Sequence, residues 1–174
     1  EGVYVHAGNG NIIGGSEAGR NIIGGLHTYS DGISLEAASG YTTISYNYIG
    51  INAAGDDTLT CQHGISIYES SYNTIGPGNV ISGNTSYGLY MAGNGARQNL
   101  VFGNYIGTNP EGTAAIGNGY DGIYLGTGAS LNRFGGSSGA ERNIISGNNR
   151  YGIFFNTSGT DSNTVKGNYI GTAV

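Results

Sequence analysis

The residues of this chain best suited to acid–base chemistry lie around His63. Six short segments open with glycine and continue with alternating apolar residues, and Asp31 and His63 directly precede that glycine in two successive segments. If the segments stack as strands, these two positions lie about 4.8 Å apart. Asp57 lies in the insertion before His63. A carboxylate raises the pKa of a nearby histidine and paired carboxylates hydrolyse glycosides, so His63, Asp31 and Asp57 are candidate catalytic residues.

Carboxylates in two insertions, residues 51–63 and 108–121, are candidate ligands for a hard cation such as calcium. They are Asp56, Asp57 and Asp121. Neither insertion matches an EF-hand loop, and the Gly-Gly-x-Gly-x-Asp nonapeptide of calcium-binding β-rolls is absent from the sequence. The sequence therefore requires no cofactor, and calcium binding stays open beside ordinary turn formation by the same residues.

Aromatic residues recur at the outward position of the glycine-led segments, as Tyr4, Tyr90, Tyr124 and Phe154. An aromatic ring offers an apolar face and tyrosine adds a polar handle, so these four are candidate carbohydrate-binding residues. Tyrosine also favours exposed strands, and cross-strand aromatic pairs stabilise sheets without any ligand. Both interpretations stay open.

A second set of tyrosines, Tyr48, Tyr105 and Tyr169, follows asparagine in segments that read Asn-Tyr-Ile-Gly. We expect these tyrosines to pack beneath the insertions, with Leu59 and Ile116 against them. This interpretation predicts buried tyrosines and little access for a ligand.

The composition excludes several classes of protein. Glycine supplies 35 of 174 residues and charged residues only 10%, which argues against long charged amphipathic helices. A net charge of -5 with six Lys and Arg argues against nucleic-acid binding. No apolar run approaches the roughly 18 residues of a membrane span. The single cysteine, Cys61, excludes an intrachain disulfide.

Three short patterns return in fixed order along the whole chain. The glycine-led segment comes first, and the five intervals between Gly2 and Gly152 average 30 residues. Two further runs follow each copy, usually opened by asparagine. The middle run supplies one apolar residue per copy: Ile13, Ile44, Ile75, Val101, Phe134 and Val165. The last run supplies isoleucine each time: Ile23, Ile49, Ile81, Ile106, Ile145 and Ile170.

Alternating apolar residues within each run predict short strands. Three strands per repeat and six repeats predict an all-β, right-handed parallel β-helix of about six coils, in a single domain over residues 1–174. The six isoleucines then form one interior column. We expect asparagine and glycine at the corners, because both tolerate left-handed backbone angles.

Asn104-Tyr105-Ile106-Gly107-Thr108 and the matching run at 168–172 resemble bacterial secreted or surface proteins of the pectate-lyase-like superfamily. The resemblance covers essentially the whole chain and implies a β-helix that is secreted or displayed on the cell surface. It leaves function open, because this fold hosts lyases, hydrolases, adhesins and spacers. Asp56-Asp57 and His63-Gly64 are similar to two polygalacturonase motifs, but the Asn-x-Asp and Arg-x-Lys motifs of that family are absent.

We expect the chain to be a segment of a longer array whose uncapped ends can associate with further copies. The preferred interpretation is a structural or binding solenoid, serving as a rod, a filament unit or a polysaccharide-binding module. The alternative is a polysaccharide lyase or glycoside hydrolase acting on acidic polysaccharide. Neither nucleic acid nor membrane insertion is expected.

Overall fold

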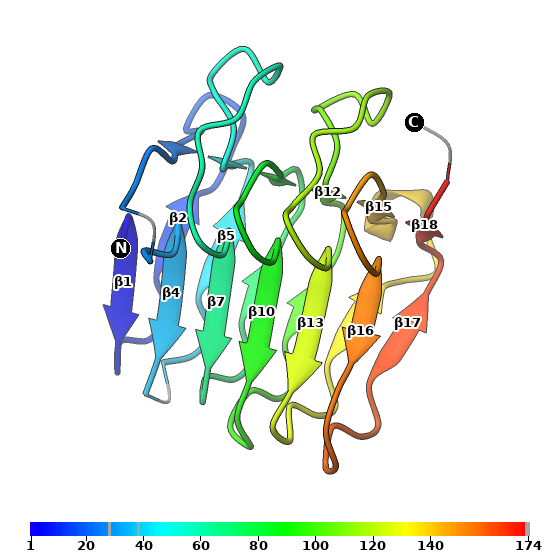
Figure 1. Cartoon of the computed structure of the whole chain (residues 1–174). Coiled ribbons are helices and arrows are strands. Elements are labelled where there is room, and N and C mark those ends of the chain that lie inside the picture. The colour runs from blue at the N-terminus through cyan, green and yellow to red at the C-terminus, as the bar shows by residue number, and fades with distance from the viewer. Residues whose placement is uncertain (28, 38, 173–174) are drawn as a thin grey trace.

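The six glycine-led segments form one parallel sheet that runs along the length of the molecule. The computed structural model describes residues 1–27, 29–37 and 39–172. In this first sheet each strand pairs with its copy one coil away, as Figure 1 shows. The strands are β1 (Val3–His6), β4 (Ile33–Glu36), β7 (Ile65–Tyr68), β10 (Leu89–Ala92), β13 (Ile123–Gly126) and β16 (Ile153–Phe155).

The two remaining runs of each repeat form a second and a third parallel sheet, again of six strands each. The second sheet contains β2 (Ile12–Gly14), β5 (Thr43–Ser45), β8 (Thr74–Ile75), β11 (Leu100–Val101), β14 (Arg133–Gly135) and β17 (Thr164–Lys166). The third contains β3 (Ile22–Ile23), β6 (Tyr48–Ile49), β9 (Val80–Ile81), β12 (Tyr105–Ile106), β15 (Ile144–Ile145) and β18 (Tyr169–Ile170). The predicted right-handed parallel β-helix of six coils is confirmed. One short 3₁₀ turn, η1 (Gly139–Glu141), precedes β15.

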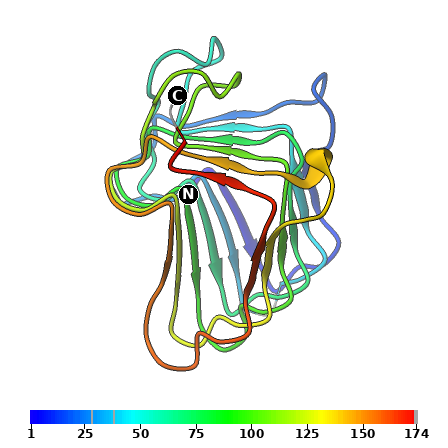
Figure 2. The same cartoon turned by 90° about the vertical axis from the view of Figure 1, so that its right-hand side faces the viewer.

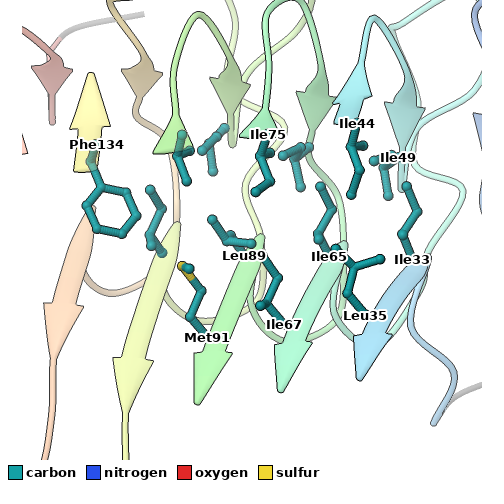
Figure 3. Close-up of a cluster of buried hydrophobic side chains, with 14 of the residues drawn as sticks. Ile33, Leu35, Ile44, Ile49, Ile65, Ile67, Ile75, Leu89, Met91 and Phe134 are labelled. Atoms are coloured by element: carbon teal, nitrogen blue, oxygen red, sulfur yellow. The ribbon is translucent and has the colours of Figure 1, made fainter. Parts of the chain in front are cut away.

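The three sheets face one another around the long axis of the molecule (Figure 2). The side chains between them form a continuous apolar core. Each strand turns one or two apolar side chains inward, and copies of the same position lie above one another in neighbouring coils. Figure 3 shows these columns, with Leu35, Ile67 and Met91 from the first sheet facing Ile44 and Ile75 from the second. The predicted isoleucine column is confirmed for five of its six members, because Ile23 is buried and Ile49, Ile81, Ile106 and Ile145 are fully buried in the third sheet, whereas Ile170 in the last coil is exposed.

Close packing explains why glycine opens each strand of the first sheet. A Cβ atom on Gly122 would lie 2.8 Å from the carbonyl oxygen of Gly152 and 2.8 Å from Cγ2 of Ile145. Gly32 and Gly88 meet the corresponding atoms of their own neighbouring coils in the same way. The glycine that opens each strand is therefore required by its close contact with the isoleucine column.

Asparagines lie at the corners as predicted, directly before β6, β9 and β12, but the expectation that they adopt left-handed angles is wrong. Among the described residues no asparagine has a positive φ, whereas glycine fills many left-handed positions as expected, and Ala, Glu, Thr and Tyr fill others. The asparagines instead form ladders along the stacking direction. In one ladder the side-chain nitrogen of Asn79 donates to Oδ1 of Asn104 at 2.9 Å, and that of Asn104 donates to Oδ1 of Asn143 at 3.0 Å. Asparagine fits because its amide both donates and accepts at every coil.

The two insertions rise as loops above the third sheet (Figure 2). Each loop is closed at its base by an antiparallel bridge, Ile51 to Thr58 in the first and Thr108 to Ala115 in the second. In the parts of the chain that the structure describes, no helix has the length and apolar character needed to cross a membrane.

Candidate functional site

The corner that leads into the first sheet carries the candidate catalytic residues. Side chains at this corner accept hydrogen bonds from backbone amides one coil further on. Oδ1 of Asp31 accepts from the amide of His63 at 3.2 Å, and Nδ1 of His63 accepts from the amide of Tyr87 at 3.4 Å. Oδ1 of Asp121 accepts from the amide of Tyr151 at 3.1 Å. These side chains hold neighbouring coils together.

The sequence correctly places Asp31 and His63 on adjacent coils, but the Asp31 carboxylate bonds to the backbone of His63 and not to its ring. Burial raises the pKa of Asp31 to about 6, and the charges of Glu1 and Glu36 act in the same direction. Burial lowers the pKa of His63 to about 4, so the ring is neutral at pH 7 with Nδ1 as an acceptor. Asp57 caps the amide of Thr58 at 2.7 Å in its own loop. No described contact joins the three as an acid–base set.

The three carboxylates proposed for a cation lie in separate surroundings. Asp56 accepts a hydrogen bond from the side chain of Asn52 at 2.8 Å in the exposed first loop, next to Asp57. Asp121 is fully buried, with Oδ1 3.7 Å from Nε of Arg150 and Oδ2 without a hydrogen-bond partner. Within the described ranges, no group of three or more His, Cys, Asp or Glu side chains is placed to hold a metal ion.

A continuous aromatic surface covers the corner and the outer face of the first sheet over coils three to six. We call it the aromatic wall, and it consists of His63, Tyr87, Tyr90, Tyr120, Tyr124, Tyr151 and Phe154. Its centre is a stack of three rings, in which Tyr90 lies between His63 and Tyr124 with centroid distances of 5.0 and 5.3 Å. Register explains the stack, because the outward positions of β10 and β13 are paired directly.

The rings of the wall differ in which surfaces they leave open. Tyr90 and Tyr124 stack on each other and on neighbouring rings, so their faces are largely occupied. Tyr120 and Tyr151 lie at the rim and are 46% and 51% exposed. Arg150 lies between these two rim tyrosines, with its guanidinium carbon 5.7 Å from one ring centroid and 5.1 Å from the other. Tyr87 and Phe154 also pack against these two rings, so the rim offers two half-exposed rings beside a cation.

Tyr4, the remaining candidate for carbohydrate binding, lies on the first coil apart from the wall. Its hydroxyl bonds to Nδ1 of His6 at 3.1 Å and donates to Glu36 at 3.0 Å. The pKa of Tyr4 is raised, first by the hydrogen bond to Glu36. Ser34 and Ser66 occupy the outward position on the two coils that separate Tyr4 from Tyr90.

A sequence profile described as "NosD: Periplasmic copper-binding protein (NosD)" matches residues 1–128, about three quarters of the chain. The chain belongs to the NosD family. Comparison with curated proteins and with solved structures finds no match. The NosD match runs from β1 to the end of β13, so it includes Tyr87, Tyr90 and Tyr124 of the aromatic wall and ends before Arg150 and Tyr151.

In this NosD-family chain the strand period predicts the outward positions of the first sheet but not the rim of the wall. Tyr120 and Arg150 lie in the turns before β13 and β16, where the strand period gives no information on direction. Tyr87 and Tyr151 hold the same position as His63, directly before the strand glycine. The signal that could have found the rim is the recurrence of aromatic residues one or two places before the strand glycine, at Tyr87, Tyr120 and Tyr151.

Proposed function

We propose that this NosD-family chain is a periplasmic or otherwise extracytoplasmic solenoid that binds carbohydrate on the outer face of its first sheet. The observation that carries the proposal is the rim of the aromatic wall, where the half-exposed rings of Tyr120 and Tyr151 flank the guanidinium of Arg150. Exposed aromatic faces take the apolar face of a sugar ring, and a guanidinium donates to its hydroxyl groups.

Each member of the wall has a distinct part in this proposal. Tyr120 and Tyr151 contact the sugar, while Tyr90, Tyr124 and Phe154 form the rigid base that positions them. The stacked base limits the rotamer freedom of the wall before a ligand arrives, which lowers the entropic cost of binding. Tyr4 adds an exposed ring at the other end of the same sheet.

Copper, named in the description of the family, finds no group of three or more His, Cys, Asp or Glu donors among the residues that the structure describes. Copper takes imidazole nitrogen with sulfur or oxygen ligands in compact sets. Burial raises the pKa of the Cys61 thiol to about 12, which opposes formation of a thiolate ligand. Met91 lies in the apolar core, and Nδ1 of His63 already accepts a backbone hydrogen bond. The proposal therefore assigns no copper site and no metal-dependent step.

A glycan array tests the proposed function, with the protein at fixed concentration and with calcium or chelator present. We expect selective glycan binding that Tyr151→Ala and Tyr120→Ala each weaken by about tenfold, a loss typical of one aromatic contact. Tyr41→Ala is the matched control, since Tyr41 is an exposed tyrosine at a different corner. An equal loss in the control, or unchanged binding by both rim variants, would overturn the proposal. Light scattering in parallel tests whether copies associate through their ends.

A further inference from the structure

The outer face of the third sheet has a repeat of two coils that does not involve the aromatic wall. Its paired outward residues alternate between tyrosine and an aliphatic side chain in the order Tyr48, Val80, Tyr105, Ile144 and Tyr169. Neighbouring strands are about 4.8 Å apart, so successive tyrosines are about 10 Å apart. The face therefore presents two equivalent segments, each with a tyrosine at either end and an aliphatic residue between.

The insertion loops cover this face only in part, which corrects the expectation of buried tyrosines. Tyr48 is 7% exposed beneath the first loop, but Tyr105 is half-buried and Tyr169 is 47% exposed. Ile116 packs, as expected, against the buried cluster that contains Tyr48, Ile51 and Val80. Leu59 instead lies over Gly25, beside the first coil. Access to the face therefore increases from coil two to coil six.

Each of the two segments contains a hollow. One has a volume of about 230 Å³ and lies between Tyr48 and Tyr105 over Val80, with Pro110 of the second loop at its edge. The other has a volume of about 340 Å³ and lies between Tyr105 and Tyr169. Tyr105 lines both hollows, so they adjoin along the stacking direction.

An arginine is held in the same way in each hollow. Arg20 lies 4.1 Å from the ring centroid of Tyr48, and its Nε donates to the carbonyl of Tyr46 at 3.2 Å. Arg142 lies 4.1 Å from the ring centroid of Tyr169, and its Nε donates to the carbonyl of Gly167 at 3.1 Å. The ring and the carbonyl fix each guanidinium plane, while the described hydrogen bonds leave the terminal Nη groups for another acceptor. These arginines are two of only six Lys and Arg residues in the chain.

We infer that this face binds a linear glycan that carries carboxylates, laid along the stacking direction across both hollows. A fixed guanidinium plane favours bidentate binding of a carboxylate. The two arginines are four coils, about 19 Å, apart, and the tyrosine floor repeats every two coils. A flat glycan chain whose disaccharide unit is about as long as two coils matches both spacings. The inference concerns a surface separate from the proposed function and stands without it.

The charges around the hollows predict whether each substitution should raise or lower the affinity for the glycan. The hollow with Arg142 has no carboxylate in its lining, whereas Glu17 lies beside Arg20 in the other. Asp56 and Asp57 lie in the loop above, and screening limits their effect to roughly 8 Å at physiological salt. Removing the Glu17 charge should therefore strengthen binding, while removing either arginine should weaken it.

The test measures the affinity of the whole chain for oligogalacturonate of increasing length, with a neutral cello-oligosaccharide of equal length as comparison. We expect Arg142→Gln and Arg20→Gln each to weaken oligogalacturonate binding by about tenfold, and Glu17→Gln to strengthen it. Oligomers that span both hollows should bind more tightly than a disaccharide, because the second contact is then intramolecular. Arg97→Gln is the matched control, since it makes the same charge change at the corner before β11.

Three outcomes would overturn the inference. They are equal weakening by Arg97→Gln, which indicates a general charge effect; unchanged affinity in the Arg20→Gln/Arg142→Gln double variant; and equal affinity for the neutral oligosaccharide. A thermal midpoint within about 2 °C of the parent in each variant ensures that lost binding is not lost folding. Tyr151→Ala separates the two surfaces, because it should leave oligogalacturonate affinity unchanged while it lowers binding at the aromatic wall.

Discussion

The ring of Tyr90 lies parallel to the ring of Tyr124, with 4° between their planes and 5.3 Å between their centroids. The two residues are direct partners in β10 and β13. Tyr87 stacks on Tyr124 from the preceding corner at 4.9 Å, and Phe154 meets it edge-on from the next coil. Tyr124 is thus the shared member of three aromatic pairs, and its main contribution is to the stability of the wall.

We predict that Tyr124→Ala lowers the free energy of unfolding by about 2–3 kcal/mol, because it removes a half-buried ring and three aromatic contacts. Tyr124→Phe keeps the ring and loses only the hydrogen bond from Asn156 at 3.1 Å, so it should cost less than about 1 kcal/mol. Denaturant unfolding measures both values. Equal stability of the alanine and phenylalanine variants would show that the stack does not support the fold.

The glycine at the start of β13 gives a second prediction. Gly122→Ala places a methyl group 2.8 Å from three atoms of the neighbouring coil, including backbone, so the coils must separate locally. We expect the free energy of unfolding to fall by about 2–3 kcal/mol, which is at the upper end of the losses that overpacking causes in a rigid core. Gly139→Ala is the control, because no atom lies within 4 Å of the added Cβ and its φ is not positive. A loss of the same size in Gly139→Ala would contradict this explanation.

The sequence was sufficient to predict the fold because the contacts that build it are periodic. Gly122 and Ile145 each recur at fixed places in every repeat, and stacking is the arrangement that brings such copies into register. The same register correctly placed Asp31 beside His63. It could not predict that the carboxylate would bond to the backbone amide of His63, since a shared coil position does not determine which atom of the neighbour is reached.

The alternation of residues along strands predicts neither the rim of the aromatic wall nor which residues adopt left-handed angles at the corners. Tyr120 and Arg150 lie in turns, where the direction of a side chain depends on the path of the turn and not on alternation. Asparagine is expected at corners because it tolerates left-handed angles, but Asn79 lies at its corner without a positive φ, and repeated burial of its amide along the stack is the stronger constraint. Tyr41 and Tyr72 occupy left-handed corners instead and stack on each other at 5.2 Å.

The ladder through Asn79 predicts a large effect for a single amide. Its nitrogen donates to Ile44 and Asn104, and its oxygen accepts from the amide of Asn47. Asn79→Ala leaves these buried groups without partners, and we expect a loss of about 3 kcal/mol or more in the free energy of unfolding. Asn94→Ala, at an exposed asparagine, should cost less than about 0.5 kcal/mol. Chemical denaturation of both variants measures the two losses of stability. Equal losses in Asn79→Ala and Asn94→Ala would show that the ladder does not stabilise the fold.

The buried carboxylate of Asp31 predicts a dependence of stability on pH. Its pKa in the folded chain is about 6, above the ordinary value of 3.8, because burial disfavours the charged form. A carboxyl whose pKa is raised by folding contributes stability that is present below pH 4 and is lost as the pH rises through 6. His63 acts in the opposite direction. Its pKa falls from 6.5 to about 4, so its contribution is present above pH 6.5 and is lost as the pH falls through 4.

Asp31→Asn separates the two effects, because the amide oxygen can still accept the hydrogen bond from the His63 backbone while the charge is removed. We expect the variant to be more stable than the parent by about 1–2 kcal/mol at pH 7.5, after allowing for partial exposure of the carboxyl, and equal to it near pH 4. Thermal unfolding across pH 4 to 8 measures the difference. Lower stability of the variant at pH 7.5 would mean that the charged carboxylate supports this corner, and would restore Asp31 as a candidate for acid–base chemistry.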